Sequence, residues 1–242
     1  MGSINISGYF VHYKVRSRKD LSIIIEHFNK YPLCTSKKIN FMVFTKIYEL
    51  IGHKLHTDVN GFLQLASLIN KLNKPLSASL TEELSILGEL PDVELESPVI
   101  NRNPDLKPFW ISGFITGEGT FTYFTRIRKK SKNETVKDFT LVMVVSVSLD
   151  SKDGYILTSI KIYFGVGKVY QESRGITKYR ITIKEEIIDK LVPHFINHPL
   201  GGNKLLQYNF WIKIVNLLLE NPKRNQERDN NINILIRDLS NF

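Results

Sequence analysis

An internal repeat constrains the fold of this chain more than any other feature of its sequence. Residues 13–50 read YKVRSRKDLSIIIEHFNKYPLCTSKKINFMVFTKIYEL, and residues 179–217 read YRITIKEEIIDKLVPHFINHPLGGNKLLQYNFWIKIVNL. With one inserted residue the two segments superpose. The matched pairs include Phe28 with Phe195, Pro32 with Pro199, and Lys37 with Lys204. Self-similarity of this kind predicts two structurally related halves.

In each copy the spacing of apolar residues predicts a strand followed by two helices. In the first copy, Val11, Tyr13 and Val15 alternate with polar residues, which predicts a half-buried strand. In front of the second copy, residues 108–164 predict a further helix, two strands and another helix, and the first copy has no counterpart of them. We therefore expect an α+β fold whose first half is truncated at its front.

The segment between the two copies predicts the domain boundaries. Residues 88–108 contain four prolines and several acidic residues, which is typical of a solvated linker. We expect a truncated half-domain at residues 1–87, a linker at 88–108 and a second half-domain at 109–242.

Charge indicates the class of partner. The 242 residues carry 33 Lys and Arg against 24 Asp and Glu, a net charge of +9, which favours nucleic acid. No stretch approaches the roughly 20 apolar residues of a membrane span, so we expect no membrane partner. Cys34 is the only cysteine, which excludes a cysteine-rich zinc site. His194 and His198 lie between two prolines, and we interpret them as structural or exposed.

A glycine-rich segment, FWISGFITGEGTFTYF at residues 109–124, joins a predicted helix to a predicted strand. Gly113 and Gly117 are four residues apart, so they leave one helix face bare for close approach of another helix. Glu118 ends that helix. Taken alone, the segment favours an ordinary turn that leads into a strand, with an incidental acid.

This segment resembles the second signature helix of the LAGLIDADG homing endonucleases. The repeat blocks, the GVGKV hairpin at residues 165–169 and PLGGNKLLQYNFW at 199–211 resemble the two-repeat members found in fungal mitochondrial introns. The resemblance implies two αββαββα repeats, signature helices packed at a pseudo-twofold axis, and sheets that sit in the DNA major groove. It also implies that Glu118 is a catalytic residue that binds a divalent metal such as Mg²⁺, and that Gly113 and Gly117 pack against a partner helix.

The sequence departs from that pattern because the first signature helix and its acid are absent. One carboxylate cannot build a shared two-metal centre, and a second copy, another protein or RNA should cover the exposed signature helix. We therefore interpret the chain as a catalytically inactive RNA-binding scaffold, either a mitochondrial ribosome component or a group I intron splicing cofactor. The alternative is a metal-dependent homing DNA endonuclease that acts as a dimer. The Ile, Asn and Lys bias is one that AT-rich genes produce, which favours the mitochondrial matrix.

The predicted strands supply a candidate nucleic-acid-binding face of alternating basic and polar residues, for which an ordinary solvated strand face is the competing interpretation. RNA is the favoured ligand on this interpretation, and DNA is the alternative. The candidate contact residues are His12, Lys14, Arg16, Thr122, Arg126, Arg128, Lys129, Lys130, Thr140, Lys178, Arg180 and Thr182.

Overall fold

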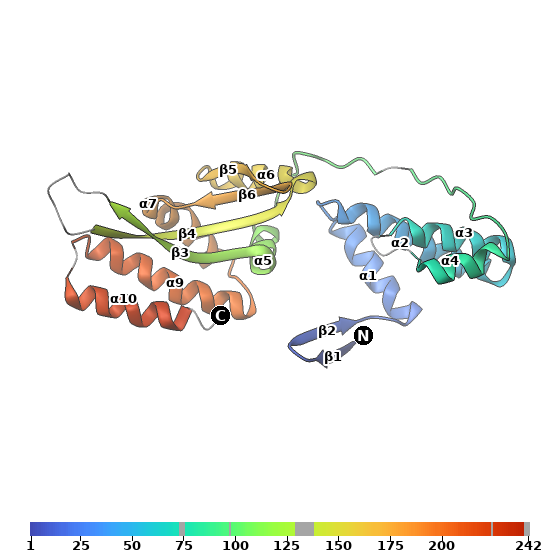
Figure 1. Cartoon of the computed structure of the whole chain (residues 1–242), viewed down its shortest axis with the longest axis horizontal. Helices are drawn as coiled ribbons and strands as arrows, with labels where there is room; N and C mark the ends of the chain where they lie inside the picture. The colour runs from blue at the N-terminus through green and yellow to red at the C-terminus, as the bar shows by residue number, and fades with distance from the viewer. Residues whose placement is uncertain (73–75, 97, 129–137, 224, 240–242) are drawn as a thin grey trace. The chain divides into compact units, whose positions relative to one another are not determined.

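Contacts divide the chain into two units, residues 1–101 and residues 102–242 (Figure 1). The computed structural model describes residues 1–72, 76–96, 98–128, 138–223 and 225–239, with the backbone alone at 127, 128, 138 and 139. Among these residues no helix has the length and apolarity needed to cross a membrane.

Unit 2 is built on one antiparallel sheet with strand order β3-β4-β6-β5. Its strands are β3 (Gly119–Arg128), β4 (Asp138–Asp150), β5 (Lys168–Glu172) and β6 (Ile176–Ile181). Its helices are α5 (Pro108–Glu118), α6 (Gly154–Phe164), α7 (Lys184–Glu186), α8 (Val192–Asn197), α9 (Gly202–Glu220) and α10 (Gln226–Leu239), with a 3-10 turn η2 (Ser151–Asp153) and a π-helical turn η3 (Ile187–Leu191). The order α-β-β-α-β-β-α expected for a complete repeat is confirmed.

The core of unit 2 lies between one face of the sheet and the helices. Alternate strand residues such as Phe121, Met143 and Tyr179 are at most 1% exposed, as period-2 burial of one sheet face requires. Phe121 packs 5.4 Å from the ring of Trp211 on α9, and the Trp211 indole N–H donates to the carbonyl of Thr122 at 2.7 Å.

Unit 1 consists of a hairpin and a group of helices. The elements are β1 (Ser3–Ser7), β2 (Phe10–Lys14), α1 (Arg18–Lys30), α2 (Lys37–Gly52), the 3-10 turn η1 (Leu55–Thr57), α3 (Val59–Asn70) and α4 (Ala78–Ser85). The side chain of Ser17 caps α1 by accepting from the Asp20 amide at 3.1 Å, and Asp58 caps α3 by accepting from the Gly61 amide at 2.8 Å. Val43, Leu63 and Leu68 form part of its small core.

The prediction of a half-buried strand in the first copy is wrong. β2 ends at Lys14, and Val11 and Tyr13 are 69% and 56% exposed. In unit 2 the matching strand β6 has β5 on one side and β4 on the other. Among the described residues of unit 1, β2 pairs with β1 alone. A strand face is buried only where a sheet and a layer of helices cover it. Alternation of apolar and polar residues along the strand does not show whether that layer is present.

Candidate nucleic-acid interface and metal site

Strand register gathers several candidate contact residues on one face of the unit 2 sheet. Arg126 on β3 lies opposite Thr140 on β4, and Arg180 on β6 lies opposite Ser146 on β4. Side chains two residues apart on a strand share a face. The face therefore includes Thr122, Arg126, Thr140, Lys178 and Arg180, on the side opposite to Phe121 and Met143. We call it the open sheet face.

The sequence did not single out Phe124, which lies on the same face. The Arg180 guanidinium carbon is 5.0 Å from the centre of the Phe124 ring, and that of Arg126 is 6.0 Å from it. Both distances suit cation–π attraction. The alternation of Thr122, Phe124 and Arg126 along β3 was the available signal.

The cations of the open sheet face differ in their neighbours. The Lys178 ammonium is 3.2 Å from a carboxylate oxygen of Glu172 on β5, so its charge is largely balanced. Arg180 lies opposite Lys168 on β5, and within the described part of the chain neither of these two residues has an ion-pair partner. Two like charges facing each other across strands are unfavourable unless an anion joins them.

The other candidate contact residues lie elsewhere. His12 and Lys14 share one face of the unit 1 hairpin and are exposed, and Arg16 lies beyond its end. Thr182 follows the end of β6. Lys129 and Lys130 fall outside the described residues, as does the side chain of Arg128.

Helix α5 positions the candidate metal ligand. Its first residue is Pro108, and Ile111, Ser112 and Ile115 form its buried face. Gly113 and Gly117 lie on the opposite, exposed face, where an added Cβ would meet no atom within 4 Å. Glu118 is the last residue of the helix, and it is exposed immediately before β3 begins.

The residue after Glu118 accepts a hydrogen bond from a lysine side chain. The ammonium of Lys204, near the start of α9, donates to the Gly119 carbonyl at 2.7 Å and to the Gln207 side-chain oxygen at 3.1 Å. Partial burial lowers the pKa of Lys204. The repeat matched Lys204 with Lys37 but did not indicate that Lys204 bonds to the backbone of the residue after Glu118.

The described residues offer few side chains that could bind a metal ion. They contain no group of three or more His, Cys, Asp or Glu side chains that could hold a metal ion. Glu118 therefore contributes one carboxylate. A hard cation such as Mg²⁺ is commonly held by one or two carboxylates together with water and substrate phosphates, so this single ligand fits a site completed by DNA and a second acid.

His194 supports α5 from beneath. It is 7% exposed; its Nε2 lies 3.0 Å from the Ser112 hydroxyl and its Nδ1 lies 3.1 Å from the Tyr163 hydroxyl. Burial, reinforced by the charge of nearby His198, lowers the pKa of His194 to about 4. The ring is therefore neutral at pH 7 and joins α5, α6 and α8, which agrees with the structural alternative for this residue.

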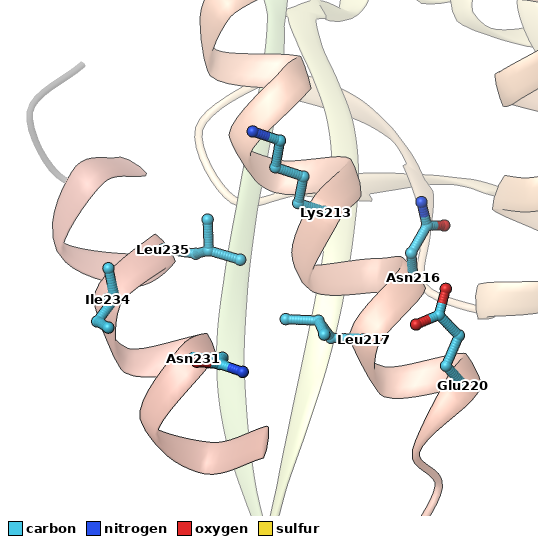
Figure 2. A pocket seen from close by; sticks show the side chains of 7 residues that line it. All are labelled: Lys213, Asn216, Leu217, Glu220, Asn231, Ile234 and Leu235. Atoms are coloured by element: carbon cyan, nitrogen blue, oxygen red, sulfur yellow. The ribbon is translucent and has the colours of Figure 1, made fainter. Parts of the chain in front are cut away.

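A separate hollow lies between α9 and α10, with Lys213, Leu217 and Glu220 on one side and Asn231, Ile234 and Leu235 on the other (Figure 2). None of the candidate site residues lines it.

Known proteins resemble this chain along most of its length. A "Probable intron-encoded endonuclease 3" of Neurospora crassa is 33% identical over 98% of this chain and 43% of its own length. A "Probable intron-encoded DNA endonuclease 1" of Mycosarcoma maydis is 25% identical over 84% of this chain and 76% of its own. The chain thus spans less than half of the Neurospora relative.

Solved structures show the same fold. The I-SmaMI LAGLIDADG homing endonuclease bound to cleaved DNA superposes with a TM-score of 0.80 at 29% identity, over 97% of this chain and 76% of that one. The same enzyme bound to uncleaved DNA in the presence of calcium ions gives a TM-score of 0.79. I-GzeII in complex with its DNA target gives 0.78 at 28% identity, over 97% of this chain and 78% of that one. The family model described as LAGLIDADG endonuclease matches residues 1–48 and 111–215. This match agrees with the internal repeat and with the helix that exposes two glycines and ends in Glu118. The chain therefore belongs to the LAGLIDADG endonuclease family.

Proposed function

We propose that the chain binds duplex DNA through the open sheet face and that Glu118 holds a divalent cation for phosphodiester hydrolysis. The observation that carries this proposal is the exposed Glu118 at the end of α5, with the Lys204 ammonium bonded one residue further along. The DNA-bound relatives support DNA over RNA as the ligand.

The residues of the chain have distinct parts in this function. Exposed cations of this sheet, such as Arg126, hold the phosphate backbone and set the position of the duplex. Glu118 binds the metal ion, which when bound activates water and stabilises charge at the scissile phosphate. Lys204, bonded to the carbonyl of the residue after Glu118, adds positive charge that attracts the phosphate.

The second acid is proposed to come from a second copy of the chain. The support is the open face of α5, where Gly113 and Gly117 leave backbone exposed and the neighbouring Phe109 is 68% exposed. Close packing of two such helices would bring two Glu118 residues together. A mitochondrial location is part of the proposal and is supported by the composition bias.

The test uses the purified full chain and a library of random DNA duplexes, from which bound sequences are enriched and then incubated with Mg²⁺ or Mn²⁺. We expect enrichment and metal-dependent strand breaks. Binding without breaks would leave DNA recognition in place and refute hydrolysis, whereas absence of DNA binding would refute the whole proposal.

The RNA-scaffold interpretation stays a prediction, favoured by the presence of one carboxylate in the described part of the candidate metal site. Competition distinguishes the two. If structured RNA displaces enriched DNA at equal or lower concentration, and no breaks form, the scaffold interpretation replaces the proposed endonuclease.

A further inference from the structure

One arginine on the open sheet face contacts an aromatic ring and makes no hydrogen bond to the part of the chain that the structure describes. Arg180 lies on β6 opposite Ser146, whereas Phe124 lies on β3 opposite Val142, so the contact between them crosses β4 above Val144. Val144 is 2% exposed although it belongs to this face. The Arg180 side chain therefore lies flat across the sheet instead of extending into solvent.

Among the described residues the N–H donors of Arg180 have no acceptor. Its Nε is buried without a hydrogen-bond partner, and within the described residues the guanidinium makes no hydrogen bond or ion pair. A guanidinium offers five N–H donors in a planar fork. The Phe124 ring fixes the orientation of the guanidinium, and its donors are unused. This arrangement suits the binding of a planar acceptor that takes two hydrogen bonds.

The neighbouring cations lack either a side chain fixed by an aromatic ring or a set of unused donors in a planar fork. Lys178 is paired with Glu172 at 3.2 Å. Arg126 is exposed and more distant from the Phe124 ring, at 6.0 Å. Lys168 is exposed at the sheet edge and carries a point charge, which suits a phosphate.

In the DNA major groove, guanine presents its N7 and O6 as two adjacent acceptors, and arginine pairs with both. We propose that Arg180, oriented by Phe124, is a guanine-reading residue of this protein, and that Lys168 opposite it contacts the backbone phosphate without reading sequence. This inference rests on the DNA binding proposed above and adds the base and the residue that recognises it.

The test starts from duplexes enriched by the wild-type chain and compares Kd values after each base pair is changed in turn. For wild type we expect one G·C pair whose replacement weakens binding about tenfold or more. Arg180→Lys should lose most of that preference at that pair alone, and Phe124→Leu should lose part of it. Thermal unfolding of each variant verifies that it is folded.

A chemical probe separates base reading from charge. Replacing that guanine by 7-deazaguanine, which lacks N7, should weaken wild-type binding and leave Arg180→Lys unaffected. Lys168→Gln is the matched control: it should weaken binding to all sequences equally and lower the salt slope by about one, with the guanine preference intact.

Two results would overturn the inference while leaving the proposed function in place. One is enrichment of duplexes with no position at which guanine is preferred. The other is a guanine preference that Arg180→Lys retains. If no duplex binds at all, the proposed function itself fails.

Discussion

The Lys204 ammonium donates to the Gly119 carbonyl at 2.7 Å, which ties the start of α9 to the residue that follows Glu118. The bond connects two segments far apart in sequence and fixes the point where α5 ends and β3 begins. A single side chain thus stabilises the junction between the signature helix and β3, and it places positive charge at the residue that follows the candidate metal ligand.

Replacing Lys204 by methionine should affect both stability and chemistry. The substitution removes the donor to the Gly119 carbonyl, and we expect a loss of about 1–2 kcal/mol in the free energy of unfolding. Urea unfolding followed by tryptophan fluorescence measures this, because Trp110 and Trp211, the two tryptophans of the chain, both lie in unit 2. Strand cleavage should slow more than DNA binding weakens.

Lys213→Met on the same helix is the control, since Lys213 is exposed and contacts the Phe210 ring at 5.5 Å. It should change stability by less than half as much. Equal losses from both substitutions would contradict the role assigned to the Lys204 bond.

The stability of unit 2 should fall on acidification because of His194. Its pKa is about 4 when folded and 6.5 as a free side chain, so protons bind the unfolded chain more tightly in this window. The stabilisation is complete above pH 6.5 and is lost as the pH falls to 4, by about 1.4 kcal/mol per pH unit and about 3 kcal/mol in all. Urea unfolding at intervals between pH 7 and pH 4 measures the slope.

His194→Gln should flatten this slope because it removes the titrating ring. It should also lower stability at pH 7, because it disrupts the hydrogen bonds with Ser112 and Tyr163. His198→Gln should keep most of the slope, because burial of His194 is the larger cause of its lowered pKa. An unchanged slope in His194→Gln would assign the acid sensitivity to other groups.

Two substitutions of Gly113 separate folding stability from self-association. A Cβ at this position meets no atom within 4 Å, and alanine is the better helix former, so Gly113→Ala should stabilise unit 2 by about 0.5–1 kcal/mol. Gly113→Leu should fold but hinder close helix packing, and it should reduce self-association in sedimentation velocity experiments and with it cleavage. Association and cleavage equal to wild type would refute packing through this face.

The sequence predicted the parts of the fold that depend on local periodicity and on the repeat. The helix ending in Glu118, the strands that follow it and the alternation of Lys178 and Arg180 with buried neighbours all follow from spacing. The hairpin at residues 3–14 was misjudged because alternation cannot show whether a covering layer exists.

Contacts between elements distant in sequence were beyond prediction. Phe124 belongs with Arg180 because strand register brings β3 and β6 to either side of β4. The pairing of Lys178 with Glu172, which weakens Lys178 as a contact residue, depends on the same register and on the hairpin between β5 and β6. Likewise, Lys204 reaches Gly119 only because α9 returns beneath the sheet, a relationship that spacing along the chain does not contain.

The most direct test of the proposed function is metal-dependent cleavage of enriched duplex DNA by the wild-type chain and by Glu118→Gln. The substitution removes the carboxylate charge and keeps the shape, so DNA affinity should change by less than about threefold, since the contacts that position the duplex lie on the sheet. We predict Mg²⁺- or Mn²⁺-dependent strand breaks with wild type and none with Glu118→Gln. Equal cleavage by the two proteins, or no cleavage of any bound duplex by wild type, would contradict the assignment of Glu118 as the metal ligand of an endonuclease.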